Sequence, residues 1–316
     1  MTQSRPQIGI SSCLLGEKVR YDGGHKRQEY IMHTLGQFVE WVRVCPEIEV
    51  GMGVPRESVR LVDADGTVSL VGARSGTDWT TRMQRYGKRR VRELGRLDLC
   101  GFVLKKDSPS CGMERVRVYA GSGQPRRDGR GAFAEELMRA MPLLPVEEEG
   151  RLTNPKLREN FLERVFAYDR WRQFRARPSP AGLVAFHARH KMLLLSHSDP
   201  HLRRLGRIVA TADKRNLAAV YDSYGEVFMT ALQVQSTVKK NVNVLQHIIG
   251  FFTDDLSDAE RAELHDVVGD YHRGLVPLVV PITLVRHYVR KHEVAYIGDQ
   301  VYLNPHPKEL MLRNHA

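Results

Sequence analysis

The residues of this sequence best suited to chemistry are three of its four cysteines. Cys13, Cys45 and Cys111 each follow a short apolar run and open a loop that contains glycine, proline or serine. Disulfides are not expected in a chain of intracellular type, so cysteines in such loops indicate metal binding or catalysis. Cys100 differs, because it lies inside the apolar run 99–103, where we expect a small buried side chain.

Three thiolates allow several kinds of site. A [4Fe–4S] cluster held by only three cysteines leaves one iron open as a thiophilic Lewis acid. A zinc ion would need a fourth ligand, for which His25 is a candidate, but the sequence lacks the closely spaced cysteine pairs typical of structural zinc. A cysteine nucleophile and three unrelated buried cysteines are further interpretations. The spacing alone does not choose among them.

The first half of the chain has the pattern of an α/β layer. Strands are expected before the three cysteine loops, at Ile8–Ile10, Trp41–Val44 and Leu97–Leu104. The other expected elements are a helix at Tyr30–Gln37, a hairpin of Val59–Val62 with Thr67–Val71, a helix from about Trp79 capped by Thr77 or Asp78, a strand at Arg115–Tyr119 and a loop at Gly121–Gly131. This alternation predicts a Rossmann-like domain with a mostly parallel sheet, in which the three cysteines meet at the carboxyl ends of the strands.

The second half has the pattern of an all-α domain. A helix is expected over Pro155–Phe174, and Arg175–Pro180 is interpreted as a linker because prolines interrupt the helical period. Further helices are expected at Leu183–His197, Leu202–Ala210, Leu217–Thr237, Val242–Phe252 and Asp258–Arg273. The predicted organisation is therefore a catalytic α/β domain over 1–150, a helical connector over 151–179 and an all-α domain over 180–316.

Charge and hydropathy limit the partners. The formal net charge is +11 with a pI near 9.6, which favours a polyanionic partner such as nucleic acid. The first ten residues lack the apolar run of a signal peptide. The longest apolar stretch, Gly274–Val285, is too short to span a bilayer and contains two prolines. We therefore expect a soluble cytoplasmic protein that requires neither a membrane nor another protein.

The cysteine motifs resemble those of the thiouracil desulfurase (TudS-type) family over about residues 6–150. The matching motifs are Ile10–Gly16 (ISSCLLG), Val19–Gly24 (VRYDGG), Val44–Glu47 (VCPE), Gly51–Glu57 (GMGVPRE) and Lys106–Gly112 (KDSPSCG). The rest of the chain resembles the helical YbgA-type domain, through Phe186–Lys191 (FHARHK), Tyr271–Thr283 (YHRGLVPLVVPIT) and Tyr302–Pro305 (YLNP). Such a fusion is the layout of RudS-like proteins, which are implicated in removing 4-thiouridine from tRNA.

The resemblance implies a specific activity and site. Cys13, Cys45 and Cys111 would ligate a [4Fe–4S] cluster whose fourth iron binds the thiocarbonyl sulfur of the substrate. Glu47 and Ser108 fall on the acidic and hydroxyl catalytic positions of the family. The implied enzyme is a non-redox, hydrolytic desulfidase. Without the resemblance, Glu47 would be a surface or helix-start carboxylate, and Ser108 a turn cap before Pro109.

Arginines supply the expected contacts to RNA. Five of them recur at helical spacing on the helix expected from Trp79, and three more lie in the loop expected after residue 120; they are Arg82, Arg85, Arg89, Arg92 and Arg96, then Arg126, Arg127 and Arg130. The all-α domain is expected to help hold tRNA. His187 and His190 are interpreted as core or RNA-facing residues, and Asp22 and Arg56 as structural. Two alternatives remain: a desulfurase of free thiouracil bases, and a non-enzymatic RNA-binding module with a structural cluster.

Overall fold

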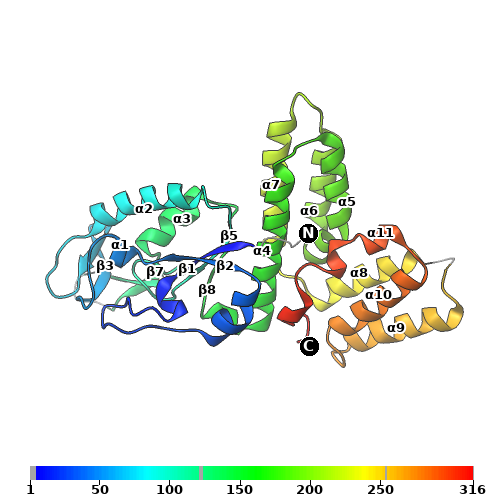
Figure 1. Ribbon diagram of the computed structural model, residues 1–316, viewed down its shortest axis with the longest axis horizontal. Helices are drawn as coiled ribbons and strands as arrows, with labels where there is room; N and C mark the ends of the chain where they lie inside the picture. The colour runs from blue at the N-terminus through cyan, green and yellow to red at the C-terminus, as the bar shows by residue number, and fades with distance from the viewer. Residues whose placement is uncertain (1–4, 121–123, 253–254, 316) are drawn as a thin grey trace. The chain divides into compact units, whose positions relative to one another are not determined.

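The structure of the protein is a computed structural model that describes residues 5–120, 124–252 and 255–315. The chain divides into two compact units, Met1–Asn154 and Pro155–Ala316, called here the α/β unit and the helical unit (Figure 1). Within the described ranges, no helix is both long and apolar enough to cross a membrane.

The α/β unit is built on a parallel four-stranded sheet with the strand order β2-β1-β5-β8. The strands are β1 (Gln7–Ser11), β2 (Glu40–Val44), β5 (Leu99–Leu104) and β8 (Val146–Glu148). All six residues of β5 are buried, which explains its continuous apolar run, since a central parallel strand is covered on both faces. Ile10 of β1 is in register with Arg43 of β2 and Val103 of β5, so these strands end at the same edge. The predicted parallel sheet is confirmed.

A second sheet in this unit has the order β4-β3-β6-β7. The hairpin of β3 (Val59–Ala64) and β4 (Thr67–Gly72) is present as expected, and β6 (Val116–Tyr119) runs parallel to β3. The loop expected at Gly121–Gly131 is wrong in part, because β7 (Arg126–Gly129) pairs antiparallel with β6. None of the four residues of β7 is buried, so the strand has no apolar alternation. Residues 121–123 of that expected loop lie outside the described residues.

Two longer helices of the α/β unit, α2 (Thr80–Leu94) and α3 (Ala132–Ala140), lie side by side (Figure 1). The ring of Phe133 on α3 meets Tyr86 of α2 and Phe102 of β5, each at a centroid distance of 6.0 Å. The N-cap of α2 is Trp79 and no side chain caps the helix, so the expected cap by Thr77 or Asp78 is wrong; Asp78 does accept a hydrogen bond from the Thr80 amide at 2.7 Å. The remaining helical segments are short: η1 (Ser12–Leu15), η2 (Tyr30–Thr34), η3 (Leu35–Gln37), α1 (Pro46–Glu49) and η4 (Arg151–Thr153).

The helical unit begins with α4 (Pro155–Arg175), which carries the fully buried Trp171. The rings of Phe186, Tyr221 and Tyr224 surround Trp171 at centroid distances of 5.3, 5.5 and 5.2 Å. The structure thus differs from the connector expected over 151–179. α4 supplies the central aromatic residue of the helical core, and the prolines after it only form a turn.

The other helices of this unit follow the expected order. They are α5 (Pro180–His197), α6 (Asp199–Ala210), α7 (Leu217–Gln233), α8 (Val238–Gly250), α9 (Asp258–His272), α10 (Val279–Lys291), α11 (Ala295–Gly298), η5 (Val301–Leu303) and η6 (Lys308–Leu310). No helix was expected after Arg273, so α10, α11, η5 and η6 are additions to the predicted order. Pro281 lies in the first turn of α10, where a missing N–H leaves no helical hydrogen bond unmade.

Candidate functional site

Three cysteines that are far apart in the sequence line one cavity at the carboxyl edge of the parallel sheet. Cys13 lies in η1 directly after β1, Cys45 separates β2 from α1, and Cys111 lies in the loop after β5. The cavity has a volume of about 300 Å³. The convergence expected for a parallel sheet is therefore present. Cys100 is 1% exposed within β5 and does not line the cavity, as expected for a core residue.

Burial and mutual repulsion keep the three cysteines in the thiol form. Burial, and then the charge of Cys45, raises the pKa of Cys13 to about 11. Burial likewise raises the pKa of Cys45, and it raises that of Cys111 well above the ordinary value. Cys45 and Cys13 both add to the shift of Cys111, which shows that the three sulfurs lie within each other's field. Binding of a metal centre would remove these protons, because a thiol that coordinates a metal is deprotonated outright.

The donor set fits an iron–sulfur cluster better than a single metal ion. No group of three His, Cys, Asp or Glu side chains in the described ranges converges closely enough to hold one ion. His25, the candidate fourth zinc ligand, is exposed and accepts a hydrogen bond from the Arg27 amide at 3.3 Å, outside the cavity lining. A cluster takes each thiolate on a different iron, so its ligands surround it instead of meeting at one point. Cys13, Cys45 and Cys111 would hold such a cluster.

Glu47 is fixed at the wall of the same cavity. It follows Cys45 in the first turn of α1, with Pro46 between them. Its Oε2 accepts hydrogen bonds from Nε of Arg56 at 3.1 Å and from Nη2 of Arg56. Its Oε1 accepts the hydroxyl of Ser110 at 2.9 Å. The carboxylate is therefore anchored at both oxygens, beside the thiols.

Arg56 ties Glu47 to the loops around the cavity, a role that the sequence interpretation did not assign to it. Its side chain is only 6% exposed. Its Nη1 donates to the carbonyls of Val19 at 3.1 Å and Gly53 at 2.9 Å. Arg56 lies in the motif Gly51–Glu57, so the motif itself was the available signal.

The two serines of the third motif have different partners. Ser108 lines the cavity, but its Oγ accepts hydrogen bonds from the amides of Ser110 at 3.2 Å and Cys111 at 3.0 Å. Ser108 therefore caps the turn that presents Cys111. Ser110 is fully buried and donates to Glu47. Ser108 was expected at the hydroxyl catalytic position of the family, where it could hydrogen-bond the base or the attacking water. In the structure, the hydroxyl that bonds Glu47 is that of Ser110.

Cations and one aromatic ring surround the thiols. The cavity is also lined by Arg20, Tyr21, Lys26, Lys105 and Lys106. Nζ of Lys105 pairs with Oε1 of Glu149 at 2.5 Å, whereas Lys26 and Lys106 are exposed and form no close ion pair in the part of the chain that the structure describes. The charge of Lys26 does act on the nearby carboxylate of Asp22. Tyr21 is 42% exposed, with the guanidinium of Arg20 at 5.4 Å from its ring centroid.

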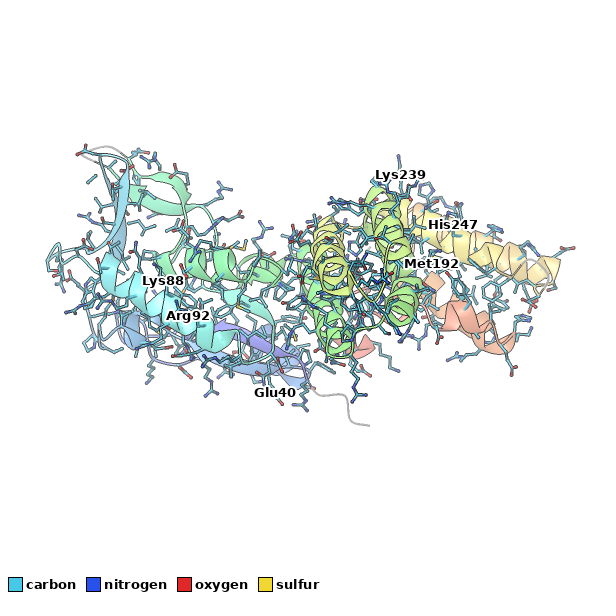
Figure 2. The ribbon with its side chains drawn as sticks, turned by 90° about the horizontal axis from the view of Figure 1, so that it is seen from above. Glu40, Lys88, Arg92, Met192, Lys239 and His247 are labelled. Carbon is cyan, nitrogen blue, oxygen red and sulfur yellow. The ribbon has the colours of Figure 1, made fainter. Side chains whose placement is uncertain are left out.

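The predicted RNA-contacting arginines fall into two groups. Those of the stripe are exposed, and Figure 2 shows Arg92 with Lys88 on α2; the set is Arg82, Arg85, Arg89, Arg92 and Arg96. Arg96 lies beyond the end of α2 at Leu94. The later arginines are engaged within the fold: Arg126 with Asp63 at 2.9 Å and Asp128 at 3.1 Å, Arg127 with Asp107 at 3.5 Å, and Arg130 with the Met113 carbonyl at 3.0 Å. Neither group lines the thiol cavity.

The two helical histidines belong to the core. His187 hydrogen-bonds to the Tyr224 hydroxyl at 3.1 Å, and His190 to the Phe186 carbonyl at 2.7 Å. Burial lowers the pKa of His187 to about 4 and that of His190 well below its usual value. Both side chains are therefore neutral, buried rings, which agrees with a core role.

Two family models match the chain. Residues 8–149 match the family described as 2-thiouracil desulfurase, and residues 191–307 match one described as a protein of unknown function, DUF1722. The first range contains all three cysteines of the cavity together with Glu47, Arg56 and Ser110.

Two curated relatives and one solved structure are similar to parts of the chain. The uncharacterized protein YbgA of Escherichia coli (strain K12) is 29% identical over 49% of this chain and 94% of its own length. The uncharacterized protein YbbK of Bacillus subtilis (strain 168) is 31% identical over 42% of this chain and 90% of its own length. A solved structure of a [4Fe–4S]-dependent thiouracil desulfidase, TudS, is 28% identical, with a TM-score of 0.40 over 47% of this chain and 93% of that protein.

Proposed function

Since the chain belongs to the 2-thiouracil desulfurase family, we propose that its α/β unit removes sulfur from a thiolated uracil by means of a [4Fe–4S] cluster. The proposed substrate is 4-thiouridine in tRNA, which becomes uridine with release of sulfide. One observation carries the proposal: Cys13, Cys45 and Cys111 line a single cavity together with the carboxylate of Glu47. A cluster that served only the fold would not need a carboxylate fixed beside its ligands.

The proposed reaction is a hydrolysis in which no electrons are exchanged. When bound, the cluster would supply a thiophilic Lewis acid that draws electrons from the thiocarbonyl carbon. A water oxygen bonds to that carbon, the carbon–sulfur bond breaks, and both water protons leave with the sulfur as hydrogen sulfide. Glu47 takes a proton from the water and returns it to the departing sulfur. Arg56 and Ser110 hold the carboxylate in position for both transfers.

Residues around the cavity support a nucleotide within RNA as the substrate. The exposed ring of Tyr21 offers a face on which an unstacked base can lie, as in other proteins that bind single-stranded RNA. The exposed ammonium groups of Lys26 and Lys106 suit the phosphates on either side of such a base. A free thiouracil base carries no phosphate, so these lysines would contribute little to its binding.

The test is anaerobic and compares three substrates. The chain is reconstituted with iron and sulfide and mixed with tRNA that contains 4-thiouridine, with free 4-thiouridine and with free thiouracil. Loss of thiocarbonyl absorbance and release of sulfide are followed together. Cys111→Ser serves as the control, because it removes a proposed ligand, and its cluster content is measured by absorbance and iron analysis.

We expect turnover of the tRNA with one sulfide released for each thiouridine consumed, and no turnover by the Cys111→Ser protein. Turnover of free thiouracil alone would keep the chemistry and reject tRNA as the substrate. Cluster binding without turnover of any substrate would reject the enzyme and leave an RNA-binding module with a structural cluster.

A further inference from the structure

Three consecutive glutamates, at positions 147–149, are buried at the end of β8 and directly after it. Acidic side chains are almost never fully buried unless they are paired. Glu149 does not line the thiol cavity, but both of its carboxylate oxygens bind residues that do. Oε1 pairs with Nζ of Lys105 at 2.5 Å, and Oε2 accepts the amide of Lys106 at 2.7 Å. The carboxylate therefore lies behind the cavity wall and fixes a lysine of that wall.

The ammonium group of Lys105 is held through two of its three N–H donors. Besides the bond to Glu149, it donates to the Lys106 carbonyl at 2.8 Å. A lysine ammonium carries three donors, and no acceptor for the third lies among the residues that the structure describes. The side chain is only 18% exposed, so water covers little of it. Lys105 therefore has one N–H donor left for a ligand in the cavity.

The positive field of this lysine reaches the sulfurs of the cavity. Burial, and then the charge of Cys45, raises the pKa of Cys13. Lys105 opposes this rise more strongly than Glu149 adds to it. The pair is therefore positive toward Cys13, although it is neutral as a whole. The carboxylate of Glu47 acts on the other two thiols, so a cation and a carboxylate act on different sulfurs of one cavity.

We infer that Lys105 stabilises the negative charge that gathers on the substrate sulfur as the carbon–sulfur bond breaks, and that Glu149 positions Lys105 for this role. The inference rests on the proposed function. The electron pair of the breaking bond stays on the sulfur, which is anionic until it has taken both protons of the attacking water and leaves as hydrogen sulfide. The ammonium keeps its own proton throughout. A fixed donor in a nearly buried site acts most strongly where charge develops, so the cation favours the departing sulfur over the neutral thiocarbonyl.

The test uses the cluster-loaded chain with sodium hydrosulfide as the probe, so no thiolated substrate is needed. Excess sulfide from reconstitution is removed by gel filtration, and hydrosulfide binding is followed anaerobically by isothermal titration calorimetry. Lys105→Met/Glu149→Gln removes both charges and leaves no unpaired ion in the wall. We expect it to weaken hydrosulfide binding roughly 10- to 100-fold, the range for the loss of a hydrogen bond to a charged group. Glu149→Gln alone should weaken binding by a smaller factor, because the ammonium remains but is less firmly held.

The matched control is Arg151→Gln/Glu147→Gln. Nε of Arg151 pairs with the buried Glu147 at 2.7 Å, but neither residue lines the cavity. The hydrosulfide dissociation constant of this variant should stay within about twofold of the wild-type value, because the pair is independent of the cavity. Circular dichroism and iron analysis check that each variant is folded and loaded. If the Lys105→Met/Glu149→Gln chain does not hold its cluster, Lys105→Gln, which keeps an N–H donor for Glu149, replaces it with the same expected loss.

Turnover kinetics separate this role from a structural one. With tRNA that contains 4-thiouridine, the Lys105 variants should lower kcat by a similar factor and leave KM unchanged, because the sulfur gains its charge only as the bond breaks. A pair that served only the fold would lower stability without changing hydrosulfide affinity. Hydrosulfide affinity within about threefold of the wild type in Lys105→Gln would overturn the inference, and so would equal losses in the Lys105 and Arg151 variants.

The outcome is separable from that of the proposed function. Loss of hydrosulfide affinity in the Lys105 variants, in a chain that desulfurates nothing, would support the anion site and reject the desulfidase. Unchanged hydrosulfide affinity in these variants, in a chain that desulfurates tRNA, would reject the role of Lys105 alone.

Discussion

Each unit has a cavity with a glutamate–arginine pair in its wall, and the two pairs have different surroundings. In the α/β unit, Glu47 is held by Arg56 on one oxygen and by the hydroxyl of Ser110 on the other, beside three thiols. The cavity of the helical unit, of about 410 Å³, is lined by Glu163 and Arg313. Among the described residues, no cysteine lines that second cavity.

The second pair is committed to the fold. Oε1 of Glu163 accepts Nη2 of Arg313 at 2.7 Å, and Oε2 contacts Nε2 of His197 at 3.2 Å. Nη1 of Arg313 also donates to the Tyr302 carbonyl at 2.6 Å. The bond from Arg313 to Glu163 joins residues that are 150 positions apart in the chain. Burial alone would raise the pKa of Glu163, but Arg313 and His197 hold it well below the usual range. An arginine-paired carboxylate is therefore not by itself a sign of catalysis. The other groups that line the cavity decide its role.

The largest effect should come from the pair beside the thiols. Glu47→Gln keeps the shape of the side chain but cannot accept a proton, so the rate of desulfuration should fall roughly 10²–10⁴-fold. The free energy of unfolding should fall by about 1.5–3 kcal/mol, because the nearly buried Arg56 loses its counter-charge but keeps its bonds to the Val19 and Gly53 carbonyls and can still donate to the glutamine oxygen. Single-turnover sulfide release and urea denaturation measure the two quantities. A rate within tenfold of the wild type would make Glu47 a structural residue like Glu163.

Breaking the pair in the helical unit should instead have its main effect on stability. Arg313→Met leaves Glu163 buried without its main counter-charge, which should cost about 3–5 kcal/mol of unfolding free energy. Urea denaturation followed by the fluorescence of Trp171, the sole tryptophan of this unit, measures the loss. The control is Arg175→Met, which breaks the exposed pair with Asp222 and should cost less than about 1 kcal/mol. Equal losses for the two variants would remove the distinction between a buried and an exposed pair.

The pH dependence of the unfolding free energy should further distinguish the cavity of the helical unit from the thiol cavity. Burial, and then the charge of Glu163, raises the pKa of Glu159 to about 8 from an ordinary value of 4.5. Between these values the folded chain keeps a proton that the unfolded chain releases. Stability is therefore full below pH 4.5 and falls as pH rises toward 8, by at most about 1.4 kcal/mol per pH unit. Glu159→Gln cannot titrate, so its unfolding free energy should depend less on pH in this window.

Urea denaturation of both proteins at several pH values measures this difference. The groups beside Glu159 are Arg313, with Nε at 3.4 Å, and His315, with Nε2 at 3.2 Å. Burial lowers the pKa of His315, so a slope that persists in Glu159→Gln and disappears in His315→Gln would assign the effect to the histidine instead.

The sequence was sufficient to predict the cavity but not its hydrogen bonds. The convergence of the three cysteines could be predicted, because each cysteine follows a strand and parallel strands end at one edge of the sheet. The strand β7 could not be predicted, since it has no buried residue and is held by backbone pairing with β6. The connector expected over 151–179 failed for another reason: the place of Trp171 in the core depends on helices that lie 15 or more residues further along the chain.

The choice between Ser108 and Ser110 shows the same limit at the site. The two serines are two residues apart in one motif, and only the turn geometry decides which hydroxyl reaches Glu47, 63 residues before Ser110. Nothing in the composition or spacing of the motif carries that information. The contact between Arg56 and Glu47 also depends on the conformation of the loop that carries Gly53. The motifs that contain Arg56 and Glu47 do not reveal that conformation.

The smallest expected effect on the rate tests directly which of the two serines, Ser108 or Ser110, acts on Glu47. Ser110→Ala removes a hydrogen bond to Glu47 without opening the turn, so the rate should fall by a factor of about five to ten, equivalent to about 1 kcal/mol. Ser108→Ala removes the acceptor for two amides of the cysteine loop, so it should lower stability and cluster retention by a similar free energy. Iron content per chain separates the second effect from the first.

A double-mutant cycle decides between the two serines. If Ser110 acts through Glu47, then Ser110→Ala should reduce the rate much less in a chain that already carries Glu47→Gln, because the two residues share one interaction. Ser108→Ala should lower the rate by the same factor in both backgrounds, since its hydroxyl bonds only to backbone amides within the described chain. The reverse pattern, with Ser108 coupled to Glu47 and Ser110 independent of it, would return the catalytic hydroxyl to the position that the family resemblance implied. It would also mean that substrate binding moves the loop of Cys111 away from the arrangement described above.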